Sequence, residues 1–314
     1  MYIVRSGESC QRPSAATIGF FDGVHRGHLH LFTQLRKAAA ARGLGTLAVT
    51  FGEHPRQTLA SDYRPHLLTT TEEKLALIGK EGLDACAVLR FDKELASLTA
   101  REFMEHYLRD RLGVRCLVVG YDHHFGSRQG EGFVQYAAYG RELGIDVVRA
   151  TALEWGGVTV SSSAVRRFLS AGNVEMACVC LGRPYDLTGV VVHGREVGRS
   201  MGFPTANLRP DSEDKMLPAV GVYAARVQPA DADCELPSGG VRAMVNVGCR
   251  PTIDDGEALT IEAHLLDFSG DLYGRRLTLL FERRLREERR FSSLEALRRQ
   301  LETDAARTLE LLAL

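Results

Sequence analysis

The sequence predicts two domains: a Rossmann-like α/β domain over residues 1–182 and a small antiparallel β-barrel with a terminal helix over residues 183–314. The chain has 314 residues, and a single hydrophobic core rarely serves a chain of this length. In the first half, short apolar runs alternate with amphipathic stretches, as in a parallel sheet covered by helices. In the second half, strand periodicity recurs between loops rich in Gly, Pro and Asp.

The first half is predicted to supply five parallel strands, over residues 15–20, 46–51, 85–90, 115–120 and 146–150. Helices between them carry start signals, because Thr70 with Glu73 and Thr99 with Glu102 have capping-box spacing. The Gly-x-Gly-x-x-Gly fingerprint does not follow the first strand, so a dinucleotide redox domain loses its main support.

The second half begins after two more helical stretches. A tight turn at residues 155–157 precedes a helix near Ser161 and another over residues 173–181, so the boundary is predicted near Gly182. Strands are predicted over residues 187–193, 221–227, 241–247, 259–268 and 276–281. A final helix from Ser292, capped by Glu295, is predicted to pack on the barrel through leucines 294, 297, 301, 309, 311 and 312.

Composition narrows the class of protein. The formal net charge of −1 gives no global attraction to nucleic acid or to an anionic membrane. The N-terminus lacks the apolar run of a signal peptide and no stretch is long enough to span a bilayer, which predicts a cytoplasmic location. Seven cysteines without a Cys-x-x-Cys spacing favour free thiols, and the oligomeric state is left open.

The loop after the first predicted strand carries His25 and His28 in the form His-x-Gly-His. The two imidazoles lie one turn apart where a strand feeds a helix, so both can donate hydrogen bonds to a nucleotide phosphate at the helix N-terminus. Gly27 lets the backbone come close to such a ligand. A metal site or a structural role is the alternative, but no third metal ligand follows at a suitable spacing. Three further histidines carry weaker signals for substrate contact: His30, His123 and His124.

A second constellation lies about 170 residues further on, where Gly198, Arg199 and Gly202 precede Thr205 and Asn207. Short oxygen-bearing side chains of this kind hold hydrated Mg²⁺ beside a triphosphate. The glycines alone could be ordinary turn residues, but an Arg and a following Pro-Thr exceed what a turn requires. The first constellation therefore favours nucleotidyl transfer, and the second favours phosphoryl transfer.

Four motifs of the first half, at residues 20–28, 50–55, 120–126 and 160–166, resemble the adenylyltransferase half of bacterial bifunctional riboflavin kinase/FAD synthetases. The resemblance implies a nucleotidyltransferase domain in which His25 and His28 stabilise the α-phosphoryl group of ATP. It also implies that Ser162, Ser163 and Arg166 hold the outgoing pyrophosphate. The remaining nucleotide-binding positions implied by these motifs are Phe20, Asp22, Gly23, Gly27 and Asp122.

Three positions depart from the commoner pattern of this family. Gly52-Glu53 replaces a usual Glu-Pro, His123 replaces a common Phe, and Ser163 replaces Thr. The serine keeps the hydroxyl, whereas the other two changes affect the surface expected to face the flavin.

The second half resembles riboflavin kinase through eight short motifs, at residues 182–185, 194–199, 202–207, 217–218, 221–223, 246–252, 262–268 and 272–274. The resemblance implies that Thr205 and Asn207 coordinate Mg-ATP and that Glu262 is the catalytic carboxylate. It also implies nucleotide contacts from Gly194, Gly198, Arg199 and Gly202. Without the resemblance, a Glu on an alternating strand is usually a solvent-facing residue.

The resemblance therefore implies phosphorylation of riboflavin by ATP to FMN, then adenylylation of FMN by a second ATP to FAD and pyrophosphate. The expected partners are these small molecules and Mg²⁺, with no nucleic acid and no membrane. A redox flavoprotein and a flavin-sensing regulator are the alternatives. A redox flavoprotein has no use for two separate motifs that bind ATP phosphates. A regulator is expected to lose Glu262 or the histidine pair and to gain a basic DNA-binding element.

Overall fold

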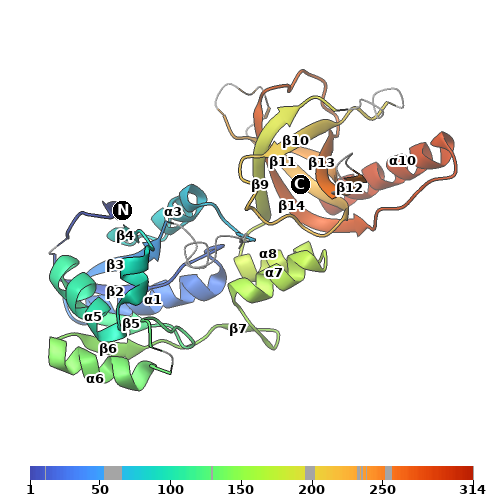
Figure 1. Ribbon diagram of the computed structural model, residues 1–314. Coiled ribbons are helices and arrows are strands. Elements are labelled where there is room, and N and C mark those ends of the chain that lie inside the picture. The colour runs from blue at the N-terminus through green and yellow to red at the C-terminus, as the bar shows by residue number, and fades with distance from the viewer. Residues whose placement is uncertain are drawn as a thin grey trace. The chain divides into compact units, whose positions relative to one another are not determined.

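The computed structural model describes residues 1–10, 12–52, 66–128, 130–194, 202–231, 234, 236–237, 239–251 and 257–313 (Figure 1). The chain forms two compact units, Met1–Ser162 and Ser163–Leu314. The first contains a parallel sheet with helices, and the second contains a closed antiparallel barrel and a terminal helix. The predicted fold class is confirmed.

The N-terminal sheet has six parallel strands in the order β1-β4-β3-β2-β5-β6. Their bounds are β1 Tyr2–Arg5, β2 Ser14–Ile18, β3 Gly45–Phe51, β4 Ala85–Leu89, β5 Val114–Val119 and β6 Asp146–Arg149. Five were predicted to within two residues, and β1 was missed. The strand order reverses at β2, with β3 on one side and β5 on the other. Ligands of open α/β sheets bind at the carboxyl ends of the strands at such a reversal.

Helices cover both faces of this sheet, and alternate residues of its inner strands belong to different cores. Leu47 and Val49 of β3 pack in one core with the helices around Phe103, whereas Ala48 packs in the other with Phe32. The helices are α1 Arg26–Ala40, α3 Thr71–Gly79, α4 Lys93–Ser97, α5 Ala100–Glu102, the π-helix η1 Phe103–Arg111 and α6 Phe133–Leu143.

Local signals were accurate at several helix starts and turns of this unit. Both predicted capping boxes, at Thr70 and Thr99, are present. The predicted tight turn lies between β7 Glu154–Trp155 and β8 Val158–Thr159, where Gly156 and Gly157 both have positive φ. Glycine adopts this conformation without the steric cost of a Cβ.

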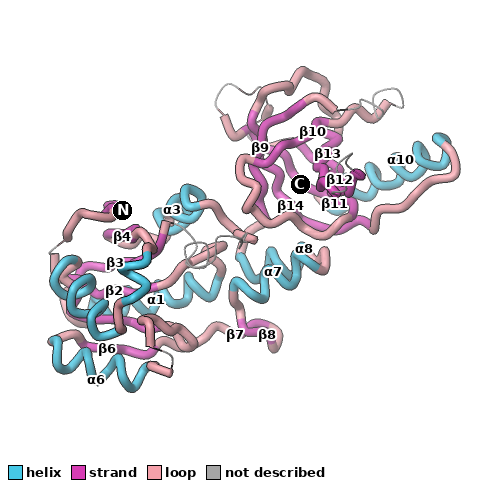
Figure 2. Tube along the Cα trace, viewed as in Figure 1, coloured by secondary structure: helices cyan, strands magenta, loops and turns pink. Residues whose placement is uncertain are grey.

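The C-terminal barrel closes in the order β10-β13-β12-β11-β14-β9 (Figure 2). The strands are β9 Tyr185–Val192, β10 Ala206–Pro210, β11 Gly221–Pro229, β12 Val241–Pro251, β13 Glu257–Leu265 and β14 Arg276–Arg286. Five were predicted. The sixth, β10, was not: it has only five residues, begins two residues after Pro204 and ends at Pro210. Those prolines made it resemble a loop.

Two helices, α7 Ser162–Ser170 and α8 Val174–Leu181, precede the barrel. Helix α8 packs on it: the Cys178 thiol donates to the carbonyl of Phe281 at 3.3 Å, and the Arg284 amide donates to the Glu175 carboxylate at 2.9 Å. The last helix of the predicted first domain therefore contacts β14 of the barrel.

The terminal helix α10, Leu294–Leu311, lies beside β12 (Figure 1). Its predicted cap is corrected, because the Ser293 hydroxyl, not Glu295, accepts from the Ala296 amide at 3.1 Å. Glu295 instead pairs with Arg299 one turn on. Leu309 and Leu312 pack on the barrel, and Leu297 and Leu301 line a cavity beside it. The packing prediction is wrong for Leu294 and Leu311, which are 68% and 39% exposed.

In the part of the chain that the structure describes, no helix combines the length and apolar character needed to cross a membrane.

Candidate active sites

The first site is built on the loop between β2 and α1. This loop bends sharply, since Phe21, Gly23 and Val24 have φ of 54°, 79° and 37°. Positive φ is uncommon for a bulky or β-branched residue and persists only where the surroundings impose it. Both Phe21 and Val24 are buried, so packing supplies part of that constraint.

The carboxylate of Asp22 supplies the rest. It is buried and accepts hydrogen bonds from the backbone amides of Leu68 and Thr69 at 2.9–3.0 Å and from the Thr69 hydroxyl at 3.1 Å. The Gly23 amide donates to the same hydroxyl at 2.9 Å. Asp22 thus braces the loop that presents the histidines. The proposed contact of Asp22 and Gly23 with nucleotide stays a prediction.

His25 and His28 lie together, as their spacing predicted. His25 is the N-cap of α1, and its Nδ1 accepts a hydrogen bond from the His28 amide at 3.3 Å. Because Nδ1 accepts, the ring proton of His25 is on Nε2, which becomes a donor. The two rings stack with centroids 3.6 Å apart. Two cations at this separation would repel strongly, so the pair favours at most one positive charge.

His28 is partly buried, and its pKa lies well below the usual value. Burial is the main cause, followed by the nearby positive forms of His25, His123 and Lys74. The imidazole is therefore neutral near pH 7. Its Nδ1 has no hydrogen-bond partner within the described residues. Basic groups from three loops or helices converge here at the carboxyl ends of the strands.

Gly27 is required by close packing. A Cβ at this position would lie 2.6 Å from the Val160 carbonyl oxygen and 3.0 Å from the His25 ring. The segment at Val160 continues to Ser162, whose hydroxyl donates to the Asp22 carbonyl at 2.9 Å. The structure thus brings the first serine of the predicted pyrophosphate motif to the histidine loop.

Ser163 and Arg166 follow Ser162 on α7, and both belong to the C-terminal unit. An α-helix start with hydroxyl side chains and an Arg one turn later suits a polyanion, because all of these groups donate hydrogen bonds. Their contact with pyrophosphate stays a prediction.

Lys74 was missed by sequence reasoning. It lies on the first turn of α3, is 2% exposed, and donates from Nζ to the Phe51 carbonyl at 2.7 Å. Its ammonium is 4.2 Å from the ring centre of Phe20, a predicted nucleotide-binding residue. Burial lowers the pKa of Lys74 to about 8, although Asp22 opposes the shift. A lysine on an amphipathic helix is normally read as exposed, so no sequence signal identified it.

The loop after β5 carries Asp122, His123 and His124. Asp122 and His124 are exposed, and the Asp122 carbonyl is 2.9 Å from the His124 Nδ1. Burial lowers the pKa of His123 to about 4. Of the weaker histidine signals, His123 is the one placed close enough to influence His28. His30 instead makes a contact of 3.1 Å between its Nε2 and the Thr151 hydroxyl.

The second site lies on the outer face of the barrel. Glu262 of β13 pairs with Asn207 of β10 on one side and with Asn246 of β12 on the other. Directly paired residues share one face of a sheet. Ile261 and Ala263 flank Glu262 and are buried, which places Glu262, Asn207 and Asn246 in one outward-facing row. Sequence reasoning identified two of these residues and missed Asn246, whose Nδ2 donates to the Glu288 carboxylate at 3.3 Å.

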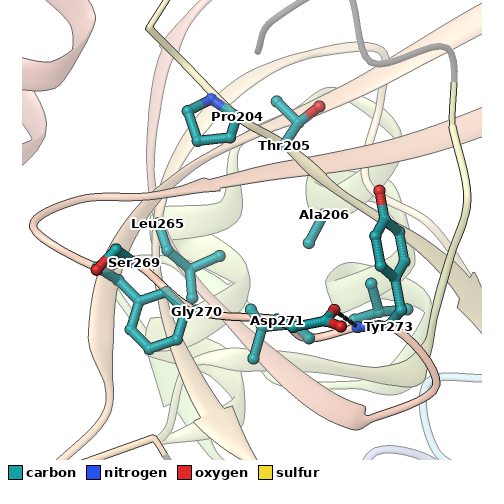
Figure 3. A pocket seen from close by; sticks show the side chains of 11 residues that line it. Pro204, Thr205, Ala206, Leu265, Ser269, Gly270, Asp271 and Tyr273 are labelled. Atoms are coloured by element: carbon teal, nitrogen blue, oxygen red, sulfur yellow. Dashed lines mark hydrogen bonds between the residues drawn. The ribbon is translucent and has the colours of Figure 1, made fainter.

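Thr205 lines two cavities. The larger, of about 630 Å³, is lined among others by Pro204, Thr205, Ala206, Gly270, Asp271 and Tyr273. Pro204 and Thr205 lie across this cavity from Gly270 and Asp271 (Figure 3). The smaller, of about 330 Å³, is lined among others by Thr205, Asn246, Glu262, His264, Arg289 and Phe291. Glu262 lines only the smaller cavity, which also contacts α10 through Leu297 and Leu301.

Neighbouring residues fix the Thr-x-Asn segment. Gly194 packs so tightly that a Cβ there would lie 2.1 Å from the Asn207 Nδ2. His264 Nδ1 is 2.7 Å from the Pro204 carbonyl, the residue before Thr205. Gly202 has φ of 84°, which favours glycine. Gly198 and Arg199, together with Glu53, lie outside the described residues.

The donors beside the smaller cavity suit Mg²⁺ better than a transition metal. The structure's described residues contain no group of three or more His, Cys, Asp or Glu side chains placed to hold a metal. Thr205 and Asn207 offer hard oxygen atoms, and Mg²⁺ typically keeps its waters and substrate phosphates as its other ligands.

The parallel sheet with a histidine-capped helix and the barrel with a Thr-x-Asn segment beside a carboxylate define a class, that of two-site, nucleotide-dependent transferases. Comparison with known proteins identifies the family within this class. Residues 7–164 match the family model described as FAD synthetase, and residues 181–312 match the one described as riboflavin kinase.

Similar full-length proteins carry both activities in their names. A bifunctional riboflavin kinase/FMN adenylyltransferase of Pseudomonas fluorescens is 42% identical, covering 94% of this chain and 92% of its own length. The protein of that name from Escherichia coli K12 is 38% identical, with 94% and 91% covered. The chain belongs to the family of bifunctional riboflavin kinase/FMN adenylyltransferases, and the resemblance predicted from its motifs is confirmed.

The fold is also shared with a crystal structure described as a macrolide-efflux protein from Streptococcus pneumoniae. The TM-score is 0.87 and the identity is 30%, and the match covers 98% of this chain and 99% of the other. Both units of the chain are therefore present in that structure.

Proposed function

We propose that this chain phosphorylates riboflavin with ATP to give FMN, and then adenylylates FMN with a second ATP to give FAD and pyrophosphate. Family membership supports both reactions. The observation that carries the proposal is the outward row of Asn207, Glu262 and Asn246 beside two cavities that share Thr205. It offers a proton acceptor, metal-binding oxygens and room for two substrates.

We assign the two substrates of the kinase step to the two cavities. Glu262 lines only the smaller cavity, so the hydroxyl that loses its proton must enter there. Riboflavin is the substrate with that hydroxyl, and the apolar side chains of Phe291 and Leu297 suit its ring system. ATP then occupies the larger cavity, and its terminal phosphate meets the hydroxyl beside Thr205. The ribityl oxygen attacks the γ-phosphorus, ADP leaves, and Glu262 accepts the proton.

We place Mg²⁺ on Thr205 and Asn207. When bound, it would offset negative charge on the ATP phosphates. The residues of this chain position the reactants: Gly194 and His264 fix the Thr-x-Asn segment, and Glu262 orients the hydroxyl. Gly198, Arg199 and Gly202 complete the proposed nucleotide-binding loop.

The adenylyl transfer is proposed at His25 and His28. An oxygen of the FMN phosphate attacks the α-phosphorus of ATP, and pyrophosphate leaves. The attacking phosphate is already an anion, so no general base is needed. The site instead supplies hydrogen-bond donors to the phosphates: the histidine pair at the start of α1, then Ser162, Ser163 and Arg166 for pyrophosphate. Phe20, Gly27 and Asp122 complete the proposed nucleotide surface.

We further propose that the chain acts in the cytoplasm on small molecules alone, without nucleic acid or membrane as a partner. The net charge of −1 supports this, because it provides no global attraction to polyanions. Binding to heparin or to anionic vesicles at about 0.1 M salt would contradict it.

Residues 1–182 and 183–314 are proposed as the adenylyltransferase and kinase domains. Two fragments test this, one starting at residue 183 and one at residue 163. Both should make FMN and no FAD. The longer fragment keeps the bonds from α8 to Phe281 and Arg284, so it should unfold at a higher denaturant concentration. A folded fragment that makes no FMN would contradict the independence of the kinase site.

One assay tests the whole function. The purified protein is incubated with riboflavin and Mg-ATP, and riboflavin, FMN and FAD are separated by chromatography over time. FMN should appear first and FAD second, with pyrophosphate released in step with FAD. Bound flavin without ATP consumption would favour a redox flavoprotein or a flavin sensor instead.

A further inference from the structure

Lys74 is a buried lysine to which the two proposed reactions assign no role. Its side chain is 2% exposed, although an ammonium loses favourable hydration when it is buried. Within the described residues, its Nζ donates to the Phe51 carbonyl at 2.7 Å, lies 4.2 Å from the Phe20 ring centre and forms no ion pair. A buried cation without a salt-bridge partner is costly, and such groups concentrate at functional sites.

The position of Lys74 connects it to the histidine loop. Phe51 is the last residue of β3, and Phe20 follows the end of β2, the strand paired with β3 in parallel. The carboxyl ends of both strands lie at the edge where α1 begins. Thr71, the residue that starts α3, donates from its hydroxyl to the Gly52 carbonyl at 2.5 Å. The first turn of α3 therefore binds two successive carbonyls at the end of β3.

The charges around Lys74 are few. Asp22, Glu72 and the Cys86 thiol favour its protonated form, and His28 is the basic group that it affects. Asp22 is already braced by Leu68 and Thr69, and Glu72 is exposed. Because no carboxylate of the described residues forms an ion pair with Lys74, Asp22 offsets its positive charge only in part, and the remainder adds to the positive end of the α1 helix. A polyphosphate bound at His25 and His28 would be attracted both by the Lys74 ammonium and by the N-terminus of α1.

We propose that Lys74 is a positioning residue for adenylyl transfer, holding the ends of β2 and β3 in place and keeping a fixed positive charge beside His28. The inference rests on the proposed adenylyl transfer at the histidine pair. Its ligand class is the polyphosphate of a nucleoside triphosphate. The charge stabilises the bound phosphates and keeps His28 neutral, so that His28 acts as a hydrogen-bond donor and not as a competing cation.

The test uses the full chain with Lys74→Met, Lys74→Arg and the matched control Lys80→Met. Lys80 is on the same helix, at its C-cap, and is exposed. FAD formation from FMN and FMN formation from riboflavin are measured on the same preparations between about pH 6.5 and 9.5. Lys74→Met should lower kcat for FAD formation by about 10²-fold, the loss that a small misplacement of the phosphate-binding groups can produce. Lys80→Met should match the wild type, and FMN formation should be unchanged in all three.

The pH profile separates charge from shape. Burial lowers the pKa of Lys74 to about 8, so wild-type FAD formation should decline as the pH rises through this value. A guanidinium stays protonated over this range, so Lys74→Arg should keep activity and move the decline to higher pH. NMR titration of the imidazoles provides a readout besides activity: Lys74→Met should raise the pKa of His28, because one cause of its lowering is removed.

Normal FAD formation by Lys74→Met with an unshifted His28 pKa would overturn the inference. Should Lys74→Met fail to fold, as judged by its circular dichroism, Lys74→Arg decides: a displaced alkaline decline supports the role, and an unchanged one refutes it. Failure of the proposed function is distinguishable, because then the wild type makes no FAD or His28→Ala leaves FAD formation intact.

Discussion

The two proposed sites gather groups of opposite character. The N-terminal site collects basic side chains, His25, His28 and Lys74, at the carboxyl ends of parallel strands. The C-terminal site places a carboxylate, Glu262, between two amides on the face of an antiparallel barrel. The first is largely buried and the second borders two open cavities.

The difference in side chains between the two sites matches the difference between the nucleophiles of the two proposed reactions. A phosphate attacks in adenylyl transfer and is already ionised, so a carboxylate beside it would only repel it. A hydroxyl attacks in the kinase step and must lose a proton, so one acceptor is needed there. Comparison of the two sites thus teaches that the protonation state of the attacking group decides which side chains a phosphate-transfer site requires. Substitutions in one site should leave the other reaction unaffected.

The largest effect is expected for Glu262→Gln. The amide keeps the size of the side chain and its place in the row but cannot accept the hydroxyl proton. FMN formation should fall by about 10²–10⁴-fold, with ATP binding little changed. FAD formation from supplied FMN should persist, and both are measured by chromatography of the flavins.

Asp267→Asn is the matched control, because Asp267 follows the same strand and its side chain is 77% exposed beside Arg242. It should retain kinase activity. Near-normal turnover by Glu262→Gln with a loss in Asp267→Asn would transfer the catalytic role to Asp267.

His28→Ala should give the next largest effect, on the other reaction. Loss of a donor to the phosphates should reduce FAD formation by about 10²–10³-fold and leave FMN formation nearly intact. His106→Ala serves as control, because His106 is an exposed histidine on η1 of the same unit. Equal loss of both activities in His28→Ala would replace the two-site comparison with one shared site.

Much of the fold was predictable because periodicity and capping are local signals. The capping boxes at Thr70 and Thr99 and five strands of each sheet follow from them. The two missed strands lack such signals: β1 is a four-residue edge strand with one buried residue, and β10 lies between prolines. Both depend on pairing with distant strands, which no local pattern encodes.

The candidate sites were predictable to a similar degree. The histidine pair is close in sequence, so its spacing predicted two imidazoles one turn apart, and the structure adds that the two rings stack. Asn246 and Lys74 were missed because their importance depends on strand register and burial. Asn246 is recognised only when β12 is paired with β13. Lys74 is recognised only when α3 is packed against the end of β3.

The third prediction concerns the stability of the N-terminal unit, because burying the charge of Lys74 should lower the free energy of unfolding. Its pKa is about 8 in the folded protein and near 10.5 when exposed, so the unfolded state binds more protons between these values. The free energy of unfolding should therefore rise with pH between about 8 and 10.5, by about 3 kcal/mol. This rise should be absent in Lys74→Met and present in Lys80→Met.

The measurement can follow the N-terminal unit alone. Trp155 is the single tryptophan of the chain and belongs to this unit, so its fluorescence reports unfolding there. Identical pH dependence in wild type and Lys74→Met would mean that the lysine is not held as a buried cation. The basic character assigned to the N-terminal site would then depend on the histidines alone.

The smallest effect is expected for His123→Phe, which restores the residue common at this position in the family. Burial lowers the pKa of His123 to about 4, below the ordinary 6.5, so the imidazole is neutral near pH 7 and its replacement removes no charge. FAD formation at pH 7 should change by less than about tenfold, since the substitution removes at most one hydrogen bond of an uncharged imidazole.

The stability of His123→Phe should depend on pH more strongly than its activity does. The unfolded state binds the extra proton between pH 6.5 and 4, so the wild type loses stability as the pH falls through this window. At pH 5 the variant should be more stable by about 2 kcal/mol, and at pH 8 the titration should contribute no difference. Urea unfolding followed by Trp155 at both pH values measures this, with the exposed His124→Phe as control. A loss of FAD formation as large as that of His28→Ala would instead make His123 a third phosphate ligand and extend the basic character of the N-terminal site.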